Sequence, residues 1–239
     1  MTKIQEPSRV EIWKMFDQIS PTYDRVNRVM TLGLDQHWRK AMVKFLPDRE
    51  EIELLDCATG TADQLICLME RSGKIKRAVG IDLAAEMVEI GKQKVQGKPY
   101  ADAISFQVAS ALELPFADAS FDCVTISFGI RNVTDVRKAL LEFLRVLRPG
   151  GKLVILEGTL PESRILKPVF LFYLRHLLPR IGGWISKNRS AYRYLNETME
   201  TFPAGEKFCG MLRRAGFRKA KAHPQTGGMV TIYTGEKNA

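Results

Sequence analysis

An arginine and an asparagine directly follow a strongly apolar stretch of the chain. Residues 121–128, FDCVTISF, are nearly all apolar or β-branched, which is typical of a strand buried on both faces of a parallel sheet. Arg131 and Asn132 come three and four residues later. A guanidinium is permanently charged and can stabilise a developing anion, and a carboxamide can orient a ring oxygen. We therefore expect a catalytic pair at the carboxyl end of this strand. In the structural alternative, Arg131 pairs with Glu157 or Asp135 and Asn132 caps the next helix.

A second candidate site lies in LLDCATGTAD, residues 54–63. A strand that passes through a tight loop into a helix can bind a nucleotide, because the helix N-terminus presents unpaired N–H groups. Asp56 and Gly60 are candidate contacts here, and the scarcity of glycine favours a ligand without a pyrophosphate. Asp82 ends the next strand, 22 residues beyond Gly60, where an acid can accept ribose hydroxyls or cap a helix. These features predict an adenosine-type cofactor and leave NAD and S-adenosylmethionine (SAM) open.

Regular alternation of strand and helix patterns must position these residues. The predicted fold is α/β: a doubly wound, mostly parallel, seven-stranded Rossmann-like sheet with an antiparallel last strand. Residues 9–46 are predicted to be helical, with a break at Ser20-Pro21. We expect an N-terminal helical cap over residues 1–46 and one domain over 47–239, with a helical insertion at about 161–200.

Composition narrows the function classes. The chain has 239 residues, 45% of them hydrophobic, as in an ordinary globular protein. Its four cysteines lack metal-site spacing, and no export signal or membrane span is evident, so we expect a cytoplasmic protein without a metal. The net charge of +9 arises in residues 161–239, which contain 14 Lys and Arg against 5 Asp and Glu. Nucleic acid, an anionic membrane and a solvated basic face could each account for it.

Three stretches resemble one enzyme family. FDQISPTYDRVNRVMTLGLDQHWR (16–39), SFGIRNVTD (127–135) and YRYLNETMETFP (192–203) look like the quinone-biosynthesis C-methyltransferases, which have the class I SAM-dependent fold. The resemblance implies C-methylation of a polyprenylated quinol with SAM as methyl donor: demethylmenaquinol to menaquinol, and in some members a benzoquinol on the way to ubiquinone. A different small molecule or RNA is the alternative acceptor, although no RNA-binding module is evident.

The resemblance also implies site residues. SAM contacts should fall on Thr61, Asp82, Ser110, Ala111 and Ser127. Two positions depart from the family pattern, because alanine at 62 replaces a usual glycine and Ser110 stands where Asp or Asn is usual. An alanine there could weaken SAM binding if its backbone needed a positive φ.

The proton acceptor is predicted from the N-terminal motif. We favour Tyr23 and Asp24, acting directly or through a water, if this segment folds over the site. His176 and His37 are the rivals, although each could be structural.

Residues 164–189, RILKPVFLFYLRHLLPRIGGWISKNR, combine apolar residues on most faces with Lys and Arg. Such a helix is buried or lies against lipid. We expect it to enclose an isoprenoid tail and to support peripheral association with an anionic membrane surface. A lid packed on the sheet and a homodimer contact are the alternatives.

Overall fold

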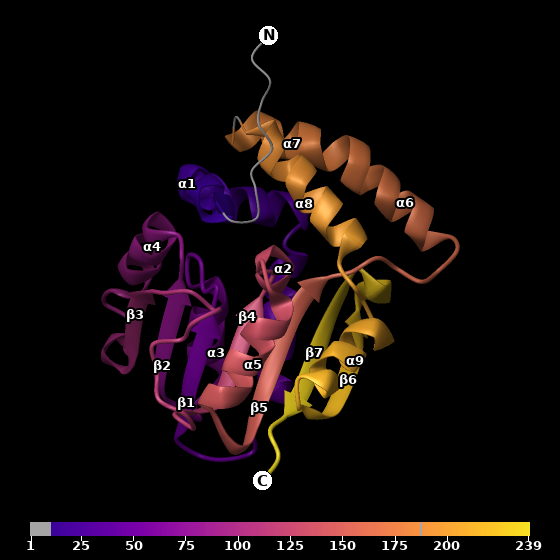
Figure 1. Cartoon of the computed structure of the whole chain (residues 1–239). Coiled ribbons are helices and arrows are strands. Elements are labelled where there is room, and N and C mark those ends of the chain that lie inside the picture. The colour runs from indigo at the N-terminus through magenta and orange to yellow at the C-terminus, as the bar shows by residue number, and fades with distance from the viewer. Residues whose placement is uncertain (1–10, 187) are drawn as a thin grey trace.

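The computed structural model describes residues 11–186 and 188–239, and a seven-stranded sheet forms its centre (Figure 1). The strands are β1 (Ile52–Cys57), β2 (Ile75–Asp82), β3 (Ile104–Val108), β4 (Phe121–Ser127), β5 (Leu147–Gly158), β6 (Arg218–Gln225) and β7 (Val230–Glu236). Their order is β3-β2-β1-β4-β5-β7-β6. The first five pair in parallel, and β7 is antiparallel to both of its neighbours. The predicted fold class and antiparallel last strand are confirmed.

The burial of β4 and of β6 follows from their positions in the sheet. β4, the source of the FDCVTISF pattern, is buried at its first six positions because β1 and β5 flank it and helices cover both faces. β6 at the edge is largely exposed and begins with Arg218 and Lys219. Charged side chains on an edge strand oppose pairing with another chain.

Helices cover both faces of the sheet. One hydrophobic cluster joins the sheet to α5 (Val136–Val146) and α9 (Glu206–Arg214), and another joins it to α2 (Leu34–Ala41) and α3 (Asp63–Ser72). The helix α4 (Ala85–Val95) packs beside α3. The apolar residues of α5 recur at helical spacing, and its N-cap Asp135 accepts a hydrogen bond from the Lys138 N–H at 2.9 Å. Asp135 thus fills the capping role considered for Asn132.

The N-terminal helix corrects one prediction. α1 (Ile12–Met30) runs without interruption through Ser20-Pro21, where the sequence indicated a break. Proline lacks an N–H and deprives the carbonyl four residues earlier, that of Asp17, of its helical donor. The Ser20 hydroxyl donates to this carbonyl at 2.8 Å and replaces the missing bond. The helix therefore continues.

A helical layer lies over the carboxyl ends of the parallel strands (Figure 1). It consists of α1 and the insertion between β5 and α9. The insertion contains α6 (Leu166–Phe172), a π-helical turn (Tyr173–Leu177), α7 (Leu178–Ser186) and α8 (Arg189–Thr201). A third hydrophobic cluster joins α1, α4, α7 and α8. Among the helices described, none has the length and apolar character needed to cross a membrane.

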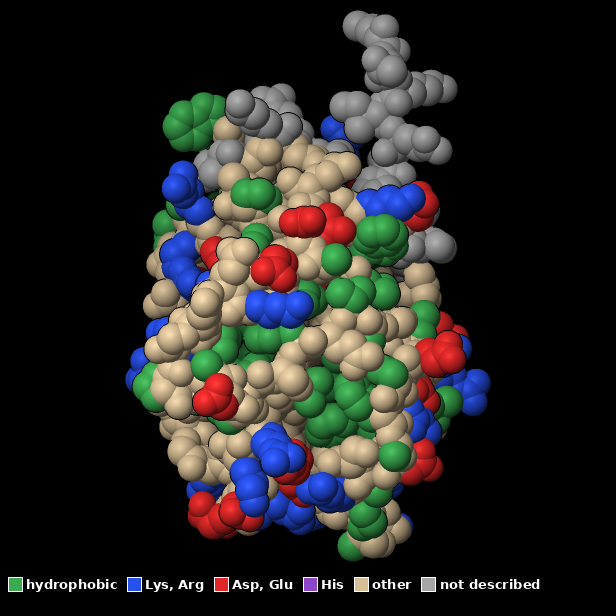
Figure 2. Space-filling model, turned by 90° about the vertical axis from the view of Figure 1, so that its left-hand side faces the viewer, with side chains coloured by type: hydrophobic (Ala, Val, Ile, Leu, Met, Phe, Trp, Pro, Cys, Tyr) green, Lys and Arg blue, Asp and Glu red, His purple; other side chains and the backbone are tan. Residues whose placement is uncertain are grey.

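Charge is unevenly distributed over the molecule. Figure 2 shows the β3 side, where basic and acidic side chains are interspersed. This mixture agrees with residues 1–160, which contain 22 Lys and Arg and 22 Asp and Glu. The positive excess therefore belongs to the later part of the chain, which includes the helical insertion.

Candidate functional site

Two cavities, each of about 430 Å³, lie between the strand ends and the helical layer. The loop cavity borders the loops that follow β1 to β4; its lining includes Gly60, Asp82, Ser110, Ala111, Ser127 and Val133. The apolar cavity lies under α1 and the insertion; its lining includes Ile19, Met30, Trp38, Phe170, Leu174 and Met199. Both adjoin the point where the strand order reverses between β1 and β4, which is where ligands bind in open α/β sheets.

Among the residues that the structure describes, four line both cavities: Phe16, Tyr23, Phe128 and Asn132. A molecule in one cavity would therefore meet a molecule in the other at these residues. Two come from α1 and two from the segment after β4. The tertiary structure thus places the N-terminal motif against the SFGIRN motif.

Asp82 is held by backbone groups at the end of β2. Its two carboxylate oxygens accept hydrogen bonds from the Gly60 N–H at 2.8 Å and the Ala84 N–H at 2.9 Å. Burial raises the pKa of Asp82, and these backbone bonds oppose the rise. A carboxylate can accept about four hydrogen bonds, so Asp82 retains capacity for ligand hydroxyls in the loop cavity.

The loop after β1 adopts left-handed backbone at alternate positions. The φ angles are +48° at Ala58, +55° at Gly60 and +65° at Ala62. Residue 62 therefore has the positive φ at which an alanine, in place of the usual glycine, could weaken SAM binding. The Ala62 side chain is buried toward α4, where a Cβ built on Gly91 would lie 3.1 Å from it, and it does not line the loop cavity. The extra methyl group thus lies away from the space available to a ligand.

The other predicted cofactor contacts divide into two groups. Ser110, Ala111 and Ser127 line the loop cavity. The Ser110 hydroxyl accepts from the Leu112 N–H at 3.1 Å, and the Ser127 hydroxyl donates to the Gln64 side chain at 3.2 Å. Asp56 near the end of β1 and Thr61 in the loop have buried side chains that line neither cavity.

Asp56 is an unusual buried acid. It accepts hydrogen bonds from the hydroxyls of Thr59 at 2.8 Å and Thr125 at 2.5 Å. Burial raises its pKa to about 6, although these bonds lower it. The neutral form therefore persists up to about pH 6 in the folded chain, above the usual range of a carboxyl group.

We expect Asp56→Asn to stabilise the protein at neutral pH. Because the folded pKa is raised, the acid's contribution to stability is fully present below pH about 4 and is lost as the pH rises through about 6. The raised pKa of Asp56 lowers the free energy of unfolding by at most about 3 kcal/mol at pH 7. Urea unfolding of both proteins from about pH 4 to about pH 7 measures it. A difference in unfolding free energy that does not change with pH would contradict this prediction.

Asp24 belongs to a charged cluster beside the loop. It accepts from the Thr61 hydroxyl at 2.6 Å and from the Lys94 ammonium at 3.0 Å. Lys94 and Arg28 both also pair with Asp63 at the start of α3. The cluster ties α1 to α3 and α4, and the Asp24 side chain lines neither cavity.

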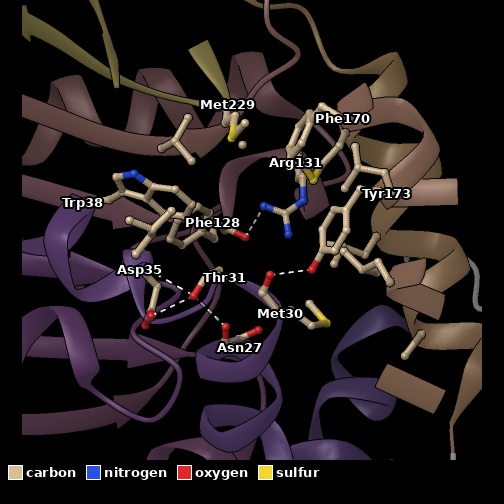
Figure 3. Close-up of a pocket in the computed structure, with 18 of the residues that line it drawn as sticks. Asn27, Met30, Thr31, Asp35, Trp38, Phe128, Arg131, Phe170, Tyr173 and Met229 are labelled. Carbon is tan, nitrogen blue, oxygen red and sulfur yellow. Dashed lines mark hydrogen bonds between the residues drawn. The ribbon is translucent and has the colours of Figure 1, made fainter. Parts of the chain in front are cut away.

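Arg131 is buried and faces the apolar cavity (Figure 3). Its Nη1 pairs with the buried Glu157 carboxylate and donates to the Phe128 carbonyl at 2.8 Å. Its Nε has no hydrogen-bond partner within the described ranges. The ion pair considered as an alternative therefore exists, and the guanidinium still lines the cavity.

Asn132 and Tyr23 are the polar residues common to both cavities. The Asn132 Oδ1 is buried and lacks a partner among the described residues, which leaves an acceptor that a ligand donor could satisfy. Burial raises the pKa of Tyr23 above its usual value of 10, so its hydroxyl stays protonated and can donate. The rival bases His37 and His176 are exposed and line neither cavity.

The sequence analysis did not single out Asn27, Thr31, Asp35 and Arg39, which line the apolar cavity. The Thr31 hydroxyl lies within hydrogen-bond distance of two acceptors, the Asn27 carbonyl at 2.8 Å and the Asp35 carboxylate at 2.9 Å, and can donate to either, as the lower part of Figure 3 shows. The Arg39 guanidinium lies 5.5 Å from the centre of the Phe128 ring. Asn27, Thr31, Asp35 and Arg39 recur every four residues, and this helical spacing of polar side chains was the signal that could have identified them.

Comparisons with known proteins agree with this geometry. Residues 1–237 match the model of the ubiE/COQ5 methyltransferase family. The chain is 44% identical over 237 residues to a ubiquinone/menaquinone biosynthesis C-methyltransferase UbiE of Geotalea daltonii, covering 99% of this chain and 100% of the relative. It is 37% identical over 227 residues to a demethylmenaquinone methyltransferase of Bacteroides fragilis, covering 95% and 92%.

A solved structure supports the fold assignment. The structure of a SAM-dependent methyltransferase of Thermotoga maritima matches with a TM-score of 0.65 at 19% identity, covering 95% of this chain and 100% of that one. At this identity the likeness concerns the fold alone. Because the family model spans nearly the whole sequence and the curated relatives match over nearly their full length, this chain belongs to the ubiE/COQ5 methyltransferase family.

Proposed function

We propose that the chain transfers a methyl group from SAM to a ring carbon of a polyprenylated quinol and converts demethylmenaquinol to menaquinol. A benzoquinol on the way to ubiquinone is a second acceptor to be tested. The names of both relatives support a quinone-pathway substrate. The central observation is that the loop cavity and the apolar cavity share Phe16, Tyr23, Phe128 and Asn132. A donor and an acceptor ring would meet there.

The loop cavity has groups that fit SAM. Asp82 offers a carboxylate to the ribose hydroxyls, and Ser110 and Ala111 border the side expected to receive the adenine. The sulfonium of SAM supplies an electrophilic methyl group. In this proposal the shared residues hold the acceptor ring in line with it, at the ~3–3.5 Å that methyl transfer requires.

The acceptor must be ionised to react. A phenolic hydroxyl has a pKa near ~10, so about one molecule in a thousand is ionised at neutral pH, at a free-energy cost of roughly 4 kcal/mol. Arg131 would stabilise the phenolate in a site with little water. Asn132 and Tyr23 would hydrogen-bond the ring oxygens and set the orientation of the ring.

Asp82→Asn tests the cofactor assignment. Removing the charge while retaining an acceptor should weaken SAM binding by about ten- to a hundred-fold, because a hydrogen bond to a charged group contributes about 1.5–3 kcal/mol. Calorimetric titration with SAM measures this loss. Ser105→Ala, on the neighbouring β3 and lining neither cavity, is the control. Unchanged affinity in Asp82→Asn would remove this residue from the site.

The function is tested by offering a demethylnaphthoquinol with and without reductant. Methylation, detected by mass spectrometry, should require the reduced ring because the oxidised quinone has no hydroxyl to ionise. A benzoquinol and transfer RNA serve as competing acceptors in the same assay. Methylation of RNA with no methylation of either quinol would contradict the proposal.

Four further expectations remain proposals. We place the protein in the cytoplasm at the inner face of the membrane, with residues 164–189 as the attachment segment, and we retain a homodimer and the absence of nucleic-acid partners. We also retain the division into a cap (1–46) and a methyltransferase domain (47–239). The packing of α1 on α4 and α7 supports a cap function for its described part.

A further inference from the structure

The turn between α1 and α2 presents a leucine in an unfavourable conformation. Leu32 has a φ of +52° and is followed by Gly33 at +77°. Its side chain is 88% exposed. Residues just beyond a helix C-terminus often adopt this left-handed conformation, but glycine or asparagine is the usual occupant. Neither backbone preference nor burial within the chain accounts for a leucine here, which makes its side chain a candidate contact for a partner.

The α6 helix also exposes apolar side chains. None of its residues is buried. Ile165 just before it, and Val169 and Phe172 within it, are 78%, 64% and 58% exposed. Their spacing of four and three residues places them on one side of the helix. A helix normally buries its apolar side chains against its own domain, but α6 packs Phe170 against the third hydrophobic cluster and leaves these three exposed.

These two apolar segments lie at one opening. Leu32 of the turn and Leu34 at the start of α2 line the apolar cavity, as do Leu166 and Val169 of α6. The Tyr173 hydroxyl donates to the Met30 carbonyl at the end of α1 and joins the two segments (Figure 3). We call this set of exposed residues the apolar rim: Leu32, Leu34, Ile165, Leu166, Val169 and Phe172.

The charge beside the apolar rim is mainly positive. Residues 162–186 contain Arg164, Lys167, Arg175 and Arg180 against a single acid, the exposed Glu162. Arg175 pairs with Glu200 of α8, whereas Arg164 and Lys167 are exposed beside Ile165 and Leu166. An apolar surface bordered by cations complements a bilayer that contains anionic phospholipid.

We propose that the apolar rim docks on an anionic phospholipid bilayer with Leu32 inserted among the acyl chains. This inference rests on the proposed function, since it supplies the route of the prenylated substrate. The opening of the apolar cavity then faces the bilayer, and the isoprenoid tail enters without crossing water. Each CH₂ group kept out of water lowers the barrier to transfer, so a long tail favours this direct route.

Leu32→Asn tests the proposal because it removes the inserted side chain and suits the backbone. Asparagine tolerates positive φ, so the variant should melt no lower than the wild type. Sedimentation uses vesicles of about two parts phosphatidylcholine to one part phosphatidylglycerol, with pure phosphatidylcholine for comparison. The wild type should prefer the anionic vesicles, and Leu32→Asn should bind them about ten-fold more weakly.

Two further variants complete the test. Ile165→Asn removes a second exposed rim residue just before α6 and should also weaken vesicle binding. Leu141→Gln removes an exposed leucine from α5 that lines neither cavity and should bind vesicles as the wild type does.

The proposal is overturned if the wild type does not bind anionic vesicles, or if both rim variants bind them as the wild type does. A dimer without vesicles that Leu32→Asn converts to a monomer would assign the rim to a second copy of the chain and also overturn it. Methyl transfer by the wild type to a prenylated demethylnaphthoquinol dispersed in detergent, without vesicles, is measured separately. Its absence would contradict the proposed function and leave the vesicle result intact.

Discussion

Replacing Arg131 by alanine is expected to lower turnover of the reduced quinol by about a thousand-fold while SAM affinity stays close to that of the wild type. The predicted loss equals the roughly 4 kcal/mol needed to ionise a phenol near neutral pH. The position of Arg131 supports this selectivity, because the residue lines the apolar cavity and not the loop cavity. Turnover with mass detection and calorimetric SAM titration measure the two quantities.

The ion pair with Glu157 complicates any single substitution. Both side chains are buried, and removing either partner leaves an uncompensated charge that destabilises a protein by about 3–5 kcal/mol. Loss of activity in Arg131→Ala alone could therefore reflect unfolding. Thermal denaturation with and without SAM must accompany the kinetics.

Glu157→Gln is the matched control. It breaks the same ion pair, and a similar loss of stability is expected. It keeps the guanidinium, however, and removes the carboxylate that partly neutralises it. If Arg131 acts as a cation on the phenolate, turnover in the folded Glu157→Gln protein is retained or raised. Equal losses of turnover in the two variants would reduce Arg131 to a structural role.

Tyr23→Phe is expected to lower turnover by about a hundred-fold, which is typical for loss of a hydrogen-bond donor to a developing oxyanion. The ring should remain in place, since Tyr23 packs edge-on against Phe16 with 6.1 Å between ring centres. Binding of SAM should therefore change little. Single-turnover rates with saturating SAM and quinol measure the chemical step.

The pH dependence distinguishes a donor from a base. Because burial raises the pKa of Tyr23, it should stay protonated, and the rate should rise up to about ten-fold per unit between about pH 7 and about pH 9 as the quinol itself ionises. Tyr23→Phe should show the same slope at a lower rate. If the rate of Tyr23→Phe no longer rose with pH, Tyr23 would instead be the base. If only the rate of Asp24→Asn no longer rose with pH, Asp24 would be the proton acceptor.

Much of the fold was predictable because local patterns agree with it. The unbroken apolar run of β4 and the alternation of strands and helices indicated a doubly wound sheet, and the absence of a helix between the last two strands indicated the antiparallel β7. The prediction that the N-terminal helix breaks at Ser20-Pro21 was wrong for a local reason. The Ser20 hydroxyl supplies the hydrogen bond that proline cannot, and propensity alone does not reveal such a substitute.

The sequence by itself determined the family motifs, the residue types available for chemistry and the segment that carries the positive charge. Only the tertiary structure decided which of those residues share a space. Asp24 and Tyr23 are adjacent in sequence, yet one joins a charged cluster and the other lines both cavities. Arg131 pairs with the buried Glu157 of β5, and Leu32 is exposed beside α6. Such outcomes depend on contacts between segments far apart in the chain, because burial and pairing are set by packing and not by local sequence.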